Sequence, residues 1–151
     1  MDRTITFRVD AAPVPQPRKR GGINPRTGKQ CVYTPKGARI TTFRQSVTLA
    51  TRLAVRQPYT GPVSLRLVII LPRPASLGNQ FPDAGRQPAW HRGRGGDGDN
   101  YEKGIADAMK GFAFVDDSQI WSTDRKKVYA AKGEKSGVEI ELTFHDVGST
   151  C

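Results

Sequence analysis

The sequence predicts a small α+β domain with one mixed β-sheet and two main helices packed on it. Stretches that alternate or run apolar are typical of strands, and two further stretches carry apolar residues at helical spacing. There is no internal repeat or heptad pattern, and 151 residues is the length of one ordinary domain. We therefore treat residues 1–151 as a single domain.

The N-terminal segment is predicted to be a strand followed by a basic arm. Residues 4–9 alternate between apolar and polar side chains, as a half-buried strand does. Residues 10–30 contain three prolines, a Gly-Gly pair and the run Arg18-Lys19-Arg20. This composition predicts a flexible, extended arm that carries positive charge.

The middle of the chain is predicted to hold a long helix and a buried strand. A short strand is expected at 31–33, and apolar residues at helical spacing predict a helix from Pro35 to about Arg56. Residues 63–71 are strongly apolar and rich in β-branched side chains, which favours a central strand. The segment 72–96 that follows is long and rich in Pro and Gly, which predicts a functional or irregular loop.

The C-terminal third is predicted to contain the second helix and the remaining strands. The helix is expected to begin around Asn100 and to end near Gly111. Strand patterns follow at 119–123 and 126–131, and residues 138–144 alternate cleanly in a last strand.

Charge is unevenly distributed along the chain. Lys and Arg total 24 against 14 Asp and Glu, which gives a net charge of +10, yet 11 of the 14 acidic residues lie from Asp97 onward. A basic surplus attracts polyanions such as nucleic acid, and a nuclease needs a carboxylate cluster for metal ions in addition. A solvated acidic face of the sheet explains the acidic residues of the C-terminal third equally well.

Several classes of protein are excluded or disfavoured. No apolar run approaches the length of a membrane span, and the first residues lack a secretory signal, so we expect a cytoplasmic protein without a membrane partner. Two cysteines and two histidines are too few and too scattered for a structural zinc site. Residues 22–29 miss the spacing of a phosphate-binding loop, and Gln30 replaces its Ser/Thr, so no nucleotide cofactor is expected.

One acidic block of the sequence contains residue types suited to binding a metal ion. Asp97 and Asp99 are two residues apart, so in an extended segment they project to the same side. In a helix that begins just after them, Lys103 lies one turn beyond Asp99. The pair Asp116-Asp117 opens the next strand and would bring a third carboxylate beside the first two. Close carboxylates repel one another unless a cation lies between them, and Mg²⁺ is a hard ion that prefers such oxygens. Alone, an Asp-x-Asp pair is more often a helix cap or a turn.

The complete block resembles the RusA family of Holliday-junction resolvases. The residues that carry the resemblance are Asp97-Gly98-Asp99-Asn100, Lys103, Ala106-Asp107-Ala108-Met109 and Val115-Asp116-Asp117-Ser118-Gln119-Ile120. The resemblance implies metal-binding, catalytic carboxylates at Asp97, Asp99 and Asp117, with Asp116 the less favoured of its pair and Lys103 as the catalytic lysine.

The same resemblance implies a Mg²⁺-dependent homodimer, with Mn²⁺ as the expected substitute, that cuts four-way DNA in recombination and repair. A symmetric pair of sites suits a junction with approximate two-fold symmetry. The chain departs from the family pattern at Tyr101, where leucine is usual, and at Gly95-Gly96, where many members carry a basic residue and proline.

Cationic residues are the candidates for DNA contact. Arg18, Lys19 and Arg20 in the arm are expected to bind the DNA backbone. Arg92 and Arg94 are expected to replace the cation that the family usually places before the first aspartate. Two other functions stay open from the sequence: a nuclease with broader selectivity for branched DNA, and a non-catalytic basic protein that binds nucleic acid.

Overall fold

The computed structural model describes residues 1–17, 20–33, 37–75, 77, 85–90 and 97–147, and for residues 20–21 and 31–33 it describes the backbone alone. The elements in chain order are β1 (Arg3–Val9), β2 (Arg20–Ile23), β3 (Gln30–Tyr33), α1 (Ala38–Ala54), β4 (Val63–Leu71), β5 (Gln87–Pro88), α3 (Gly98–Met109), the 3-10 helix η1 (Asp117–Gln119), β6 (Ile120–Tyr129) and β7 (Gly137–Phe144).

The main sheet has five strands in the order β1-β7-β4-β6-β5. β4 lies at its centre, antiparallel to β7 and parallel to β6, and the remaining pairs are antiparallel. The predicted mixed sheet is therefore confirmed. Because β4 and β6 are parallel neighbours, the chain between them must cross from one end of the sheet to the other, and α3 lies in that crossover.

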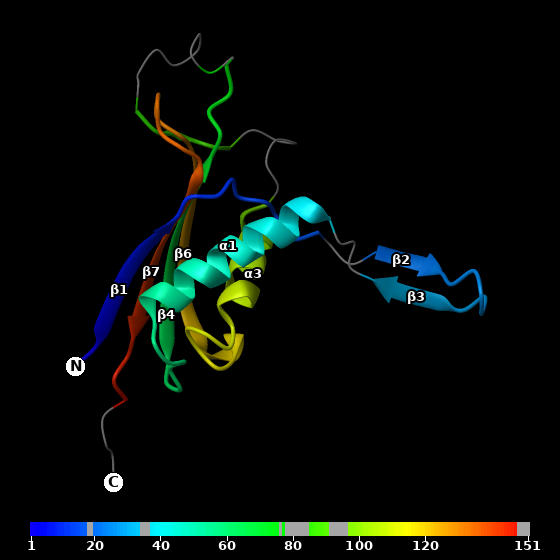
Figure 1. The fold of residues 1–151 in the computed structure, drawn as a ribbon, viewed down its shortest axis with the longest axis horizontal. Coiled ribbons are helices and arrows are strands. Elements are labelled where there is room, and N and C mark those ends of the chain that lie inside the picture. The colour runs from blue at the N-terminus through cyan, green and yellow to red at the C-terminus, as the bar shows by residue number, and fades with distance from the viewer. Residues whose placement is uncertain (18–19, 34–36, 76, 78–84, 91–96, 148–151) are drawn as a thin grey trace.

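Both helices cover the same face of this sheet (Figure 1). Alternate β4 residues such as Leu65 and Leu67 are buried in a core that also contains Phe43 of α1 and Ile105 of α3. The opposite face is polar: Arg66 forms ion pairs there with Asp124 of β6 and with Glu141 of β7. A second buried cluster contains Tyr101 of α3 with Ile69 of β4 and Tyr129 of β6, so α3 packs on the sheet through both clusters.

The boundaries differ from the predicted ones in three places. α1 spans Ala38–Ala54, within the predicted 35–56. The strands expected at 119–123 and 126–131 are one continuous strand, because β6 pairs with the whole of β4 and absorbs a register shift at its start. In the 72–96 segment, described only in part, residues 87–88 form the edge strand β5.

The predicted arm, residues 10–30, contains strand β2 and the first residue of β3. Residues 20–33 form a separate antiparallel hairpin, β2–β3, rather than an irregular segment. Before the hairpin, Gln16 lies against α3, where its backbone N–H donates to the Asn100 carbonyl at 3.1 Å. The turn formers in this stretch close a hairpin, which composition alone does not distinguish from a coil.

A polar cluster joins the first residues to the end of β7. His145 contacts Ser64 through Nε2 at 2.5 Å and Asp2 through Nδ1 at 2.9 Å, and Asp2 also accepts the backbone N–H of Asp146. These hydrogen bonds lower the pKa of the Asp2 carboxyl below its usual range. Within the described residues, no helix is long and apolar enough to cross a membrane.

Candidate active site

The N-terminus of α3 carries the first two predicted carboxylates. Asp97 is the N-cap residue, with an extended backbone and no capping hydrogen bond from its side chain. Its carbonyl accepts the N–H groups of Asn100 and Tyr101. Asp99 lies in the first turn and is exposed. A negative side chain is favourable there because the N-terminal end of a helix carries partial positive charge.

The buried face of α3 decides which side chains face outward. Tyr101, Ile105, Ala108 and Met109 are all buried. Tyr101 is only 1% exposed, and this burial raises the pKa of its phenol. With that stripe held in the core, the polar side chains at helical spacing project from another face of the helix.

A small pocket of about 220 Å³ lies between α3, η1 and the start of β6. Its charged lining residues are Glu102, Lys103 and Asp107 from α3 and Asp117 from η1, and Ala106, Ile120 and Thr123 complete the wall. Asp99, Lys103 and Asp107 are spaced four residues apart, so they follow one face of the helix. Asp99 therefore lies one turn from the lysine that lines the pocket.

Glu102 joins this site to β6. Its Oε2 accepts a hydrogen bond from the Arg125 guanidinium at 3.3 Å, whereas its Oε1 is buried without a hydrogen-bond partner among the described residues. The Arg125 side chain passes close to Gly98 at the start of α3, where a Cβ would lie 2.7 Å from Arg125 Nε. Glycine at position 98 thus allows Arg125 to lie against the helix N-terminus and to reach Glu102.

The turn that presents Asp117 is held by Gln119. The Gln119 Oε1 accepts the backbone N–H groups of Val115 and Asp116, both at 2.8 Å. Its Nε2 donates to the carbonyls of Tyr59 and Gly61, which precede β4. Four hydrogen bonds from one side chain therefore fix the position of η1 relative to the central strand.

The two adjacent aspartates have different surroundings. Asp116 caps η1, accepting hydrogen bonds from the backbone and hydroxyl of Ser118, and it forms an ion pair with Lys110 at 2.9 Å. The hydrogen bonds from Ser118 have the largest effect on Asp116, and together with Lys110 they hold its pKa well below the usual range. Asp116 in turn raises the pKa of Lys110. Asp117 is exposed and lines the pocket. The side chain of Asp116 therefore has a structural role, which leaves Asp117 to face the pocket.

The predicted site residues are brought together in part. Asp117 and Lys103 line one pocket, while Asp97 and Asp99 lie beyond its wall at the N-terminal end of α3. Among the described residues, no three His, Cys, Asp or Glu side chains are placed to hold one metal ion. Arg20 lies in β2. The other predicted DNA contacts, Arg18, Lys19, Arg92 and Arg94, lie outside the described residues.

Four residues of the site were missed from the sequence. Asp107 repeats the spacing of Asp99 and Lys103, so its place on that face was readable from the helix period. Gln119 was part of the quoted block but had no assigned role. Glu102 and Arg125 meet only through the packing of α3 on β6, and they are 23 residues apart, so no local pattern reveals their contact.

The donors at this site fit a hard divalent cation. Carboxylate oxygens are the ligands that Mg²⁺ prefers, and this ion is commonly held by one or two carboxylates together with waters and substrate phosphates. The buried Glu102 Oε1, without a described partner, lies beside the pocket that Asp117 lines. A buried carboxylate oxygen without a donor is costly, and a cation nearby relieves that cost.

Two comparisons with known proteins bear on the family of this chain. A family model described as endodeoxyribonuclease RusA matches residues 10–143. The chain is also 33% identical over 141 residues to a protein of Bacillus subtilis (strain 168) with the printed name "Uncharacterized protein YqaN", and the match covers 91% of this chain and 94% of that protein. The matched region includes the hairpin, α3, η1 and the strands of the main sheet except β1, which lies entirely before it, and the last residue of β7. The chain therefore belongs to the RusA family of endodeoxyribonucleases.

Proposed function

We propose that this endodeoxyribonuclease is a Mg²⁺-dependent enzyme that resolves four-way DNA junctions by paired phosphodiester hydrolysis, as a cytoplasmic homodimer. One observation carries the proposal: α3 and η1 place a lysine and carboxylates around one pocket in a protein of net charge +10. Positive charge attracts DNA, and the acidic pocket supplies ligands for the ion that hydrolysis requires.

Asp97, Asp99 and Asp117 would hold the metal ion in this proposal. A bound Mg²⁺ supplies a Lewis acid for the scissile phosphate and makes water a stronger nucleophile. The described side chains are not placed for three carboxylates to share one ion, so the proposal requires DNA phosphates and water to supply ligands and to draw the two ends of the site together.

Lys103 is proposed to stabilise the charge that develops on the phosphate. It is exposed at the pocket and lies one turn from Asp99. An ammonium group held at that position interacts more strongly with the transition state, which carries more negative charge, than with the bound substrate.

A junction-cleavage assay tests the proposal. Labelled four-way DNA is incubated with the protein and Mg²⁺, with a chelator, and with Asp99→Asn. We expect symmetric nicks with Mg²⁺ and none with the chelator, while Asp99→Asn retains or improves binding because it removes negative charge near phosphates. Sedimentation analysis of the same sample tests the dimer.

The alternatives are separate outcomes of this assay. Cutting of flaps and forks as rapidly as four-way DNA would assign a nuclease of broader selectivity. Tight binding without any nick under Mg²⁺ or Mn²⁺ would assign a non-catalytic binding protein. Equal loss of binding and cutting in Asp99→Asn would give that residue a folding role, which circular dichroism detects.

A further inference from the structure

The β2–β3 hairpin stands apart from the rest of the molecule (Figure 1). Its strands pair only with each other, in a two-stranded sheet separate from the main one. Residues 22–30 include no buried side chain, and Ile23 is 69% exposed. An isolated two-stranded hairpin is only marginally stable in water. Because no described side chain at 22–30 is buried, packing within the protein does not explain why the hairpin projects from the body.

The tip of the hairpin is well defined by its own hydrogen bonds. The Asn24 side chain accepts the backbone N–H of Arg26 at 2.9 Å. The Asn24 backbone bonds to Gly28 and Lys29, both at 2.8 Å, and Gly28 takes a positive φ of 67°. Only glycine adopts that conformation without strain. These bonds define the conformation of the turn.

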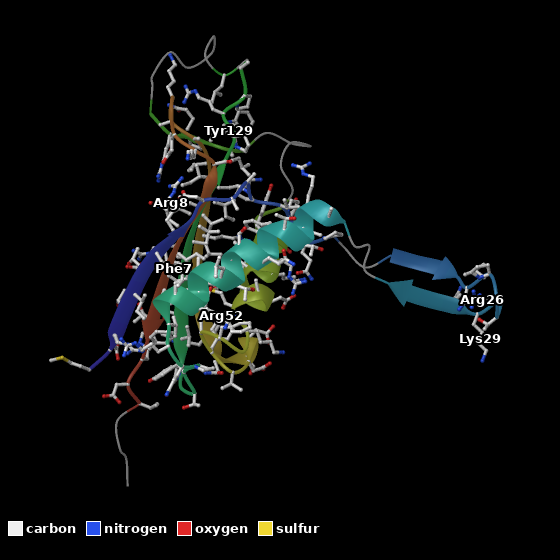
Figure 2. The ribbon with its side chains drawn as sticks, in the orientation of Figure 1. Phe7, Arg8, Arg26, Lys29, Arg52 and Tyr129 are labelled. Atoms are coloured by element: carbon white, nitrogen blue, oxygen red, sulfur yellow. The ribbon has the colours of Figure 1, made fainter. Side chains whose placement is uncertain are left out.

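Two cations occupy this surface. Arg26 and Lys29 are exposed at the far end of the hairpin (Figure 2). No described carboxylate forms an ion pair with either one, in contrast to Arg66, Arg86 and Arg125 on the body. Two such charges on a projecting turn fit a polyanion.

The base of the hairpin is tied to the proposed catalytic helix. Gln16 donates its N–H to the carbonyl of Asn100, the residue after Asp99, and three residues separate Gln16 from β2. A strand advances by about 3.4 Å per residue, so four residues and a turn reach roughly 15–20 Å beyond the base. A reach of this size corresponds to several base pairs of duplex, and a two-stranded ribbon is narrow enough for the major groove.

We propose that the β2–β3 hairpin is a DNA-binding arm whose tip residues Arg26 and Lys29 contact the backbone of a duplex several base pairs from the scissile phosphate. This inference rests on the proposed function, because it takes DNA as the substrate. It adds a contact point at the tip to the DNA contact that the sequence predicts for the run Arg18-Lys19-Arg20.

The salt dependence of binding tests the contact. Binding to four-way DNA is measured across salt concentrations in an Asp99→Asn background, with Arg26→Ser/Lys29→Ser and with the charge-matched control Arg56→Ser/Lys132→Ser, whose cations are exposed elsewhere. Each lost phosphate contact lowers the slope of log K against log salt by about 0.9, so the tip variant is expected to lose about 2 and the control none. An unchanged slope, or an equal loss in the control, would overturn the proposal.

A second measurement locates the tip on DNA. Thr27→Cys, in a background with Cys31→Ser and Cys151→Ser, is labelled with an iron chelate that generates hydroxyl radicals. Strand scission is expected about four to six base pairs from the nick made by the active enzyme, and scission at the nick itself, or none, contradicts the proposed reach. If the unlabelled wild type never cuts junctions, the proposed function fails; if it cuts and the tip variant binds normally, only the hairpin proposal fails.

Discussion

The acidic pocket and the basic hairpin differ in how the chain holds them. Side chains from distant segments fix the pocket, through Gln119 to the residues before β4 and through Glu102 to Arg125 on β6. Only local bonds within the turn fix the hairpin tip. Chemistry at a phosphate requires positions that do not shift, whereas contact with a long polymer requires reach. The two regions should therefore respond to mutation in different ways.

The largest effect is expected from Asp117→Asn. Asp117 is a proposed metal ligand, and loss of a ligand removes several kcal/mol of transition-state stabilisation, so cleavage should fall about a thousand-fold while junction binding is retained. Asp116→Asn is the adjacent control and should retain most activity, because Asp116 caps η1 and pairs with Lys110. Single-turnover cleavage and gel-shift binding on the same preparations measure both quantities. Similar cleavage rates in the two variants would remove the distinction drawn between these neighbours.

Lys103→Met should have the next largest effect. Removing one group that stabilises developing charge typically costs about 100-fold or more in rate, and Lys103→Arg should recover part of it, because it keeps the charge but changes the geometry. The hairpin tip variant should instead weaken binding and leave the rate of bound enzyme unchanged. Single-turnover rates at saturating protein separate the two. A Lys103→Met variant that loses only affinity would place Lys103 with the DNA contacts.

Gln119→Leu should lower both stability and activity. The substitution leaves backbone groups of Val115 and Asp116 without their acceptor, at an expected cost of about 2–4 kcal/mol in the free energy of unfolding. Urea unfolding measures this cost, and Gln57→Leu at an exposed position serves as the control. If stability falls but the cleavage rate of folded protein is unchanged, Gln119 supports the fold without positioning Asp117.

The smallest effect is expected on the pH dependence of folding stability. Because the folded-state pKa of Asp116 is lowered, its stabilising contribution is complete at neutral pH and is lost as the pH falls below about 4 towards the folded value. Asp116→Asn should therefore lower the stability at pH 7 and make the stability fall less steeply as the pH is lowered. The midpoints of urea unfolding, measured at several pH values, report both effects. The pair of Arg86 with Glu134, whose pKa is lowered to about 2, leaves a residual decline in both proteins. Parallel curves would mean that Asp116 contributes little.

The parts of the fold that the sequence predicted are those with a local signal. Alternation marked the strands at 4–9 and 138–144, and the run of branched residues marked the central strand. Strand β3 was predicted as the short strand at 31–33, but β2, and with it the hairpin, was missed because β2 has only four residues and two of them are glycines. Short strands without a buried face carry no periodic signal.

Only those features of the candidate site that depend on one segment of the chain were predictable from the sequence. Asp99 and Lys103 are related by the helix period, and Asp117 was identified by resemblance to a family. The contact of Glu102 with Arg125 and the four bonds of Gln119 depend on how α3 and β6 pack together. The cluster of Ser64, His145 and Asp2 joins residues more than 80 positions apart along the chain. Such contacts follow from tertiary structure, which no local pattern encodes.

The parallel pairing of β4 with β6 also has a practical consequence. A parallel pair demands a long connection, and here that connection carries both halves of the proposed site, α3 and η1. Residues 72–96 enter the same connection ahead of Asp97, so extra residues inserted there would lengthen the path to the pocket without altering the pairing of the two strands.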